Sequence, residues 1–224
     1  MKNSEVAVTG LSGMIGKHLI EIFELNNIKY LDLNRSIWDL SKWMPQNKFD
    51  KLLSKTDTIF HFGAVLPSYQ GGIKKLFDIN VRSCLNIAEW AHKNNKNIIY
   101  ISSSTVYSDP NKKNIIEEDK KVISGLGGFY ANSKLIAENI FNYFKSKGLH
   151  VAILRPSSVY GTGMNEDAMI PAFIRKASQG KTLEVYDYNN KINFINAYDV
   201  ANASFMCYKK NIYRTFNIGS GSLI

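Results

Sequence analysis

The chain has few cysteines and no long apolar segment. Two cysteines occur among 224 residues, Cys84 and Cys207, far apart in sequence and each within a predicted helix. We therefore expect two free, buried thiols in a reducing compartment rather than a disulfide. No apolar run approaches the roughly 18 residues that a membrane span needs, and polar residues 1–5 lead directly into a predicted strand. The sequence thus predicts a cytoplasmic protein with neither a signal peptide nor a membrane span.

Patterns typical of metal binding and nucleic-acid binding are also missing. The four histidines are isolated from one another, so none has the spacing of a metal site. The formal net charge is +9, from 28 Lys and Arg against 19 Asp and Glu, but the basic residues are scattered, with no aromatic-interleaved strip among them. We therefore predict no metal and no nucleic-acid partner, and interpret the charge as a general attraction for an anionic cofactor and substrate.

Apolar strand patterns alternate with amphipathic helix patterns along the chain, which predicts an α/β fold. With 45% apolar residues the chain can bury a full core. Such alternation implies right-handed crossovers and a Rossmann-type, doubly wound parallel sheet. The predicted strands lie near residues 5–9, 28–33, 57–62, 97–102, 149–154 and 215–218, and the predicted helices near 14–26, 72–94, 130–147, 166–179 and 198–209.

These elements suggest three parts of the chain with different tasks. We assign residues 1–160 to a dinucleotide-binding core, 161–195 to a substrate-binding segment, and 196–224 to a return helix and the last strand of the core. The C-terminal substrate-binding portion is therefore small and shortened. A charged segment, 111–128, is expected to lie over the active site.

A glycine pattern follows the first predicted strand. Glycines in a strand–turn–helix segment let the backbone approach a pyrophosphate, which the free N–H groups of the helix N-terminus then bind. The alternative is a βα turn of purely structural use, but the position after the first strand favours dinucleotide binding. The predicted cofactor contacts in this segment are Gly10, Ser12, Gly13, Met14, Ile15 and Gly16.

Two further segments carry groups suited to proton transfer. Tyr130 and Lys134 are four residues apart, so they share a helical face, and a cation beside the phenol would lower its pKa toward neutrality. Taken alone, such a pair is more often a solvated helix face. A run of hydroxyl residues, 102–105, ends the fourth predicted strand, where ligands bind in open α/β sheets, although it would also suit a turn or a helix cap.

Taken together, these segments resemble the extended short-chain dehydrogenase/reductase family, the NAD-dependent epimerase/dehydratase group that acts largely on nucleotide sugars. The matching segments, in sequence order, are residues 9–16, 61–64, 78–81, 102–107, 130–134, 155–161, 198–201 and 216–219.

The resemblance implies a role for each matching residue. Tyr130 would be the acid/base, Lys134 its pKa modulator and a ligand of the nicotinamide ribose, and Ser103 the hydroxyl that binds the reacting oxygen. Asn80 would support the cofactor site, with an ordinary polar helix residue as an equal alternative. The resemblance also implies a homodimer through helix 72–94 and the helix from Tyr130. Further implied cofactor contacts are Asp39, Leu40, Phe62, Gly63, Ala64, Asn80, Ser102, Pro156 and Ser158, and implied substrate contacts are Leu66, Ser104, Thr105 and Ser158.

The cofactor is expected to be NAD or NADP. Asn34 stands where NAD-preferring relatives often carry an acidic residue, and Arg35 follows it, a pair that would accept a 2′-phosphate and favours NADP. Asp32 would serve a ribose diol if the register shifts. The stretch 34–41 is very short, which predicts no helix between the second and third strands and is similar to NADPH-dependent ketoreductases.

The resulting functional hypothesis is an NAD(P)-dependent epimerase or oxidoreductase that acts on a nucleotide sugar. The alternatives are an NADPH-dependent 4-keto-sugar reductase and a non-catalytic dinucleotide-binding or scaffold protein. Ser104 and Thr105 stand where dehydratases carry an acidic pair, which disfavours dehydration because hydroxyls do not exchange protons near neutrality. Ser158 and Ile192 replace an asparagine and an arginine that are common in the substrate motifs of the family.

Overall fold

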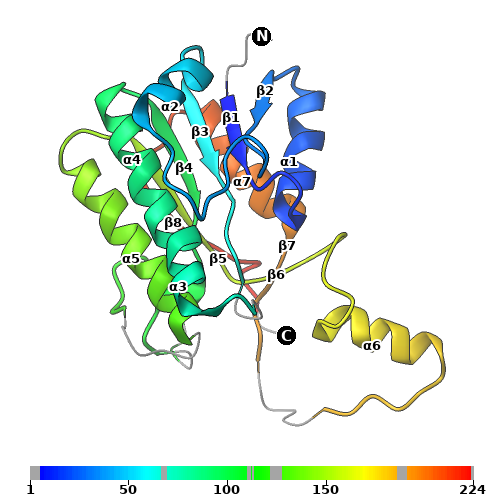
Figure 1. Cartoon of the computed structure of the whole chain (residues 1–224). Helices are drawn as coiled ribbons and strands as arrows, with labels where there is room; N and C mark the ends of the chain where they lie inside the picture. Colours follow the sequence, from blue (N-terminus) through cyan, green and yellow to red (C-terminus); the bar gives the residue numbers. More distant parts are fainter. Residues whose placement is uncertain are drawn as a thin grey trace.

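A six-stranded parallel sheet forms the centre of the chain (Figure 1). The computed structural model describes residues 6–66, 70–109, 112, 114–121, 128–185 and 191–222. The strand order is β2-β1-β3-β4-β5-β8. β2 therefore lies on one side of β1, whereas β3 and the later strands lie on the other side, so the strand order reverses between β1 and β3. All six predicted strands are present, as β1 (Val6–Thr9), β2 (Tyr30–Asp32), β3 (Thr58–His61), β4 (Asn97–Ile101), β5 (Val151–Pro156) and β8 (Thr215–Ile218).

Helices cover both faces of this sheet, which confirms the doubly wound α/β fold. On one face α1 (Met14–Leu25) packs beside α7 (Ala197–Lys209), and on the other α4 (Ser83–Lys93) packs beside α5 (Gly128–Lys145). Side chains of a strand alternate between the two faces. Val6 and Val8 accordingly join the core under α1 and α7, while Ala7 joins the core under α4 and α5.

One short helix was not expected from the sequence. Residues 34–41 contain no helix, but α2 (Gln46–Leu53) follows them before β3, so the prediction that no helix lies between the second and third strands is wrong. Phe49 and Leu53 lie one turn apart and are both fully buried. The ring of Phe49 packs 5.0 Å from that of Trp38 and 5.8 Å from that of Trp90. Aromatic contacts with Trp38 and Trp90 therefore hold the buried face of this helix against the core.

The predicted helix 72–94 is continuous but not uniform. It begins as α3 (Gly72–Phe77), widens into a π-helical segment (Asp78–Arg82) and continues as α4. A π-helical turn inside an α-helix is rare and often occurs at functional sites. The segment contains Asn80, whose side chain is 1% exposed.

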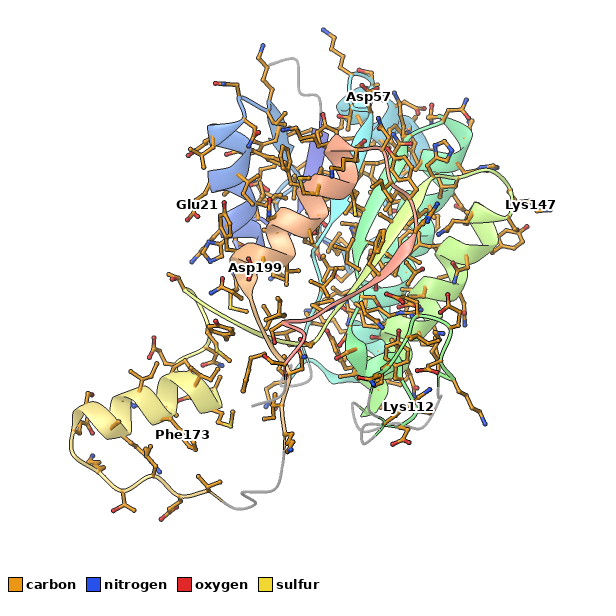
Figure 2. The ribbon with its side chains drawn as sticks, turned by 180° about the vertical axis from the view of Figure 1, so that it is seen from behind. Glu21, Asp57, Lys112, Lys147, Phe173 and Asp199 are labelled. Carbon is orange, nitrogen blue, oxygen red and sulfur yellow. The ribbon has the colours of Figure 1, made fainter. Side chains whose placement is uncertain are left out.

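The segment that carries α6 (Met169–Ser178) stands apart from the sheet and its covering helices (Figures 1 and 2). No residue of α6 is buried, and Phe173 lies on it well away from the core. A small parallel sheet of β6 (Ser158–Tyr160) and β7 (Phe194–Asn196), also unpredicted, lies where this segment leaves and rejoins the core. The proposed division into 1–160, 161–195 and 196–224 stays a prediction.

Other expectations concern thiols, membranes and assembly. Cys84 and Cys207 are free and buried, as predicted. Within the described ranges, no helix has both the length and the apolar character to cross a membrane. The homodimer and the cytoplasmic location stay predictions.

Candidate active site

The turn between β1 and α1 forms one side of the candidate site. Gly10 has a φ of +79°, and the Gly13 N–H donates to the Gly10 carbonyl at 3.0 Å. A Cβ at Gly16 would lie 2.3 Å from that carbonyl oxygen, so only glycine lets the helix start this close to the strand. No side chain caps the N-terminus of α1, and its first turn holds no acidic residue. Its first N–H groups can therefore bind an anionic group.

The end of β3 forms the second side, directly beside this turn. Thr9 Oγ1 accepts the Gly63 N–H at 3.0 Å, and a Cβ at Gly10 would lie 2.6 Å from the Gly63 nitrogen. The Leu40 side chain packs against Gly63, where a Cβ would lie 2.6 Å from Leu40 Cδ1. Gly10, Leu40 and Gly63 therefore meet at the carboxyl ends of β1 and β3. In a doubly wound sheet this crevice, where the strand order reverses, is the place for a dinucleotide.

His61 lies inside the core and contacts Thr9 beside this crevice. Its Nδ1 lies 3.0 Å from Thr9 Oγ1 and its Nε2 lies 3.2 Å from Ser83 Oγ. Because Ser83 donates its hydroxyl proton to the Ile79 carbonyl, we assign the Nε2–H tautomer of a neutral imidazole, which donates to Ser83 and accepts from Thr9. Burial, with the nearby Lys134 cation, lowers the pKa of His61 to about 3.

The residues expected to select the cofactor lie after β2. The Asn34 side chain accepts the Ser36 N–H at 3.0 Å and donates to Asp32 Oδ2 at 3.4 Å, while Arg35 Nε lies 3.9 Å from Asp39 Oδ2. A hydrogen bond from the Ser41 hydroxyl holds the pKa of Asp39 below its ordinary value. Asn34 and Arg35 thus each contact a carboxylate, and a 2′-phosphate at this position would meet negative charge. The expected preference for NADP has no support here.

Asn80 links the loop after β3 to α5, the helix that carries Tyr130 and Lys134. Its Oδ1 accepts the Val65 N–H at 2.8 Å, and its Nδ2 donates to the Val65 carbonyl at 3.0 Å and to Ser133 Oγ at 3.2 Å. These contacts favour the supporting role over that of an ordinary polar helix residue.

Ser103, Tyr130 and Lys134 converge where β4 ends against α5. Ser103 lies close enough to Tyr130 for its side chain to lower the pKa of the phenol. The Lys134 side chain is 3% exposed, and its Nζ donates to the Ile101 carbonyl at 2.8 Å and lies 5.9 Å from the centroid of the Tyr130 ring. Thr105 donates both its N–H and its hydroxyl to Ser103 Oγ, at 3.2 and 2.9 Å. These contacts leave the Ser103 hydroxyl proton available for a neighbouring oxygen.

Burial governs the protonation of this cluster. It raises the pKa of Tyr130 to about 12, with the Ser103 side chain acting in the opposite direction, and it lowers the pKa of Lys134 to about 8. The prediction that Lys134 brings the tyrosine pKa down toward neutrality is therefore wrong for this arrangement. Loss of hydration dominates, since burial disfavours the charged phenolate, and the opposing effect comes from Ser103 rather than from Lys134. Tyr130 holds its proton at neutral pH.

A cavity of about 700 Å³ opens beyond the hydroxyl run. The predicted substrate residues Ser104, Thr105 and Ser158 line it, whereas Leu66 lies outside its lining and is 61% exposed. Asn114 and Ile115 of the charged segment 111–128 also line the cavity, while residues 111, 113 and 122–127 of that segment lie outside the described ranges.

The other predicted contacts are divided between surface, crevice and core. Ser12 and Gly13 are exposed, and Met14, Ile15, Phe62 and Ala64 are partly buried around the crevice. Ser102 is buried behind Ser103, and Pro156 is buried in β5 without lining the cavity. A role for Pro156 and Ser158 at the cofactor stays a prediction.

Comparison with known proteins identifies the family. Residues 6–219 match the NAD dependent epimerase/dehydratase family. The chain belongs to this family. UDP-glucuronic acid decarboxylase 6 of Arabidopsis thaliana is 28% identical over 203 residues, which cover 82% of this chain and 59% of that protein. The chain therefore spans about three fifths of the length of that relative.

Solved structures of the family share the fold. UDP-N-acetylglucosamine 4-epimerase from Bacillus cereus is 29% identical with a TM-score of 0.85, and the match covers 99% of this chain and 77% of that one. MoeE5 in complex with UDP-glucuronic acid and NAD is 25% identical with a TM-score of 0.79, over 99% of this chain and 78% of that one. These likenesses confirm the resemblance deduced from the motifs.

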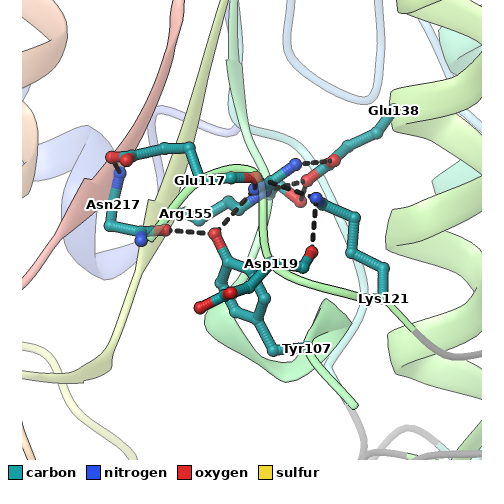
Figure 3. Close-up of polar contacts among 8 residues, drawn as sticks. Tyr107, Glu117, Asp119, Lys121, Glu138, Arg155 and Asn217 are labelled. Atoms are coloured by element: carbon teal, nitrogen blue, oxygen red, sulfur yellow. Dashed lines mark hydrogen bonds and ion pairs between the residues drawn. The ribbon is translucent and has the colours of Figure 1, made fainter. Parts of the chain in front are cut away.

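A buried polar network at the wall of the cavity was not predicted from the sequence of this epimerase/dehydratase-family chain. Arg155 on β5 forms a two-pronged ion pair with Glu138 on α5, with Nη2–Oε2 at 2.6 Å and Nε–Oε1 at 2.9 Å. Arg155 Nη1 also donates to the Tyr107 hydroxyl at 2.7 Å, which in turn donates to Asn217 Oδ1 at 2.6 Å (Figure 3). One sequence signal was available, since Glu138 follows Lys134 by four residues and shares its helix face.

Proposed function

We propose that this chain is an NAD-dependent nucleotide-sugar epimerase, with Tyr130 as its acid/base, Ser103 as the hydroxyl that binds the reacting oxygen, and Lys134 as the supporting cation. The observation that carries the proposal is the convergence of these three side chains where β4 ends against α5, next to Ser104 and Thr105, which line the 700 Å³ cavity. Family membership and the 29% identity with a UDP-N-acetylglucosamine 4-epimerase support it.

The residues of the crevice fit a dinucleotide. The uncapped start of α1 would bind its pyrophosphate, and the close approach of Gly10 to Gly63 leaves the backbone there without side chains in the way. The carboxylates of Asp32 and Asp39 favour a ribose diol over a 2′-phosphate, so we propose NAD. When bound, its nicotinamide supplies the acceptor and donor of the hydride.

Side chains of this protein bind the sugar oxygen and transfer its hydroxyl proton. Ser103 accepts two hydrogen bonds from Thr105, so its hydroxyl donates a hydrogen bond to the sugar oxygen and fixes the position of that oxygen. Because Tyr130 begins as the phenol, it must first release its proton to solvent; the phenolate then takes the hydroxyl proton of the sugar when that carbon is oxidised and returns it when the carbonyl is reduced. Lys134, held by the Ile101 carbonyl, places a cation near the phenol ring and stabilises this phenolate.

The reaction type follows from what lies next to Ser103. Ser104 and Thr105 supply no group that titrates near neutrality, and dehydration needs such an acid and base, so we place epimerisation first. The short stretch 34–41 keeps a 4-keto-sugar reductase as the second candidate. A non-catalytic role is disfavoured because all three groups are present and lie near one another where β4 ends against α5.

Incubation with a panel of UDP-, GDP- and dTDP-sugars, with and without added NADPH, tests the proposal when the products are analysed by mass spectrometry and NMR. We expect an isomer of unchanged mass without added cofactor. A gain of two mass units that depends on NADPH would instead establish the reductase, and loss of water would refute the argument from Ser104 and Thr105.

Tyr130→Phe tests the acid/base. We expect turnover to fall by about 100-fold or more, because general acid/base catalysis typically contributes factors of about 10² to 10⁴. NADH binding, followed by fluorescence, should persist. Tyr213→Phe is the matched control, because Tyr213 stacks on His150 beyond the opposite end of the sheet. Equal turnover of the Tyr130 variant and this control would remove Tyr130 from its role.

A further inference from the structure

Glu138 contacts both elements that carry the three proposed catalytic groups. It lies on α5, one turn after Lys134 and two turns after Tyr130, and its side chain is 1% exposed. Its Oε1 accepts the hydroxyl of Ser102, which immediately precedes Ser103 at the end of β4. A single carboxylate therefore joins the helix of the acid/base to the strand end of the oxygen-binding hydroxyl.

Arg155 extends this link to the wall of the cavity. Besides its ion pair with Glu138, its Nη1 donates to the Tyr107 hydroxyl and to the Glu117 carbonyl, at 2.7 and 2.9 Å. The Glu117 carboxylate in turn accepts the N–H of Asn217 on β8, at 2.7 Å. Figure 3 shows these side chains pointing toward one another from α5, β5, β8 and the segment before α5. Tyr107, Arg155 and Asn217 all line the cavity.

Stability alone explains this pair poorly. Removing two charges from water has a desolvation cost that their attraction often only balances, and a well-packed apolar pair of equal volume is frequently as stable. What an apolar pair cannot do is hold fixed hydrogen-bond directions toward Ser102 and Tyr107. Both Glu138 oxygens and all three Arg155 nitrogens are engaged in such bonds.

We propose that Glu138 is a positioning residue, which sets Ser103 against Tyr130 and Lys134 through Ser102 and, through Arg155, aligns the cavity wall with them. This inference rests on the proposed function for its catalytic consequence. Its structural part, the fixing of the strand end by Glu138, stands independently.

An electrostatic consequence separates this role from simple packing. The groups that face Lys134 are Tyr130 and Glu138 on its own helix, Tyr100 on β4, Cys84 on α4 and His61 on β3. Burial lowers the pKa of Lys134, and the negative charge of Glu138 acts against that effect. Neutralising Glu138 should therefore lower the Lys134 pKa further and move the alkaline limb of the kcat/KM profile to lower pH.

Two variants test the proposal. Ser102→Ala removes the link to the strand end and keeps the ion pair, whereas Glu138→Gln removes the charge. For Ser102→Ala we expect kcat to fall about tenfold, since small misplacements of reacting groups lower rates by up to about 100-fold, with KM and NADH affinity within about twofold. Its pH profile should keep the wild-type shape. Glu138→Gln should lower kcat and also shift the alkaline limb.

Amide hydrogen exchange of residues 102–107 gives a second readout that needs no activity. Ser102→Ala should exchange faster there, with β1 and β3 unchanged. Ser146→Ala, an exposed serine at the end of α5, is the matched control. Wild-type kcat together with wild-type exchange in Ser102→Ala would overturn the inference. If the wild-type chain turns over no nucleotide sugar, the proposed function fails and the exchange measurement alone decides the positioning role.

Discussion

Acid should destabilise this protein through His61, beginning above the pH at which carboxylates titrate. The imidazole is 1% exposed, accepts from Thr9, donates to Ser83, and stacks between Trp38 and Tyr100. Protonation would add a charge in a buried site and remove the acceptor that Thr9 uses. The folded state therefore excludes a proton that the unfolded chain binds freely.

The size of the effect follows from the two pKa values. In the unfolded chain the His61 pKa is near 6.5, and in the folded protein burial lowers it to about 3. Between these values the unfolded state binds more protons, so stability is fully present above pH 6.5 and is lost as pH falls toward 3. The limiting slope is about 1.4 kcal/mol per pH unit, which integrates to about 2.3 kcal/mol between pH 6.5 and 4.5.

Urea unfolding followed by circular dichroism measures this loss directly. We expect the free energy of unfolding to fall by about 2 kcal/mol from pH 6.5 to 4.5, and the fall to shrink in His61→Gln, which keeps the donor toward Ser83 but does not titrate. His150→Gln is the control, because His150 is exposed. An equal fall in wild type and His61→Gln would refute a neutral His61 as its source.

The remaining predictions concern Asn80 and Gly16 at the proposed cofactor crevice. Asn80→Ala leaves the N–H and carbonyl of Val65 without their partner, so we expect a loss of about 2–5 kcal/mol in the free energy of unfolding, measured in urea; a loss below about 1 kcal/mol would mean that water replaces the amide. Gly16→Ala places a Cβ 2.3 Å from the Gly10 carbonyl oxygen, so the turn must shift. NADH affinity, measured by fluorescence titration, should fall at least about tenfold, as a 1.4 kcal/mol loss implies, and unchanged affinity would place the cofactor elsewhere.

The regular elements were predictable because their signals are local. β1 is an apolar run that stops at Gly10, and α1 begins just after Gly13, so strand, turn and helix are all readable within one short segment. The prediction of no helix before β3 rested on the short stretch 34–41 and overlooked Phe49 and Leu53, which lie one turn apart and form the buried face of α2. The π-helical turn around Asn80 was also not predicted. The side-chain amide of Asn80 forms hydrogen bonds with Val65 and Ser133, which lie outside that turn.

In the candidate site, too, the features with local sequence signals were predicted and those that depend on the fold were not. The structure brings Ser103, Tyr130 and Lys134 together where the sequence predicts, because strand ends and helix spacing are local properties; their catalytic roles stay predictions. The sequence does not show that Arg155 pairs with Glu138, because that contact exists only once α5 packs against β5. The prediction of a lowered Tyr130 pKa was wrong for a related reason: the spacing of Tyr130 and Lys134 is visible in the sequence, whereas burial is a property of the whole fold. Burial raises the Tyr130 pKa to about 12, so the packing, and not the charge pattern, determines the protonation state of this phenol at neutral pH.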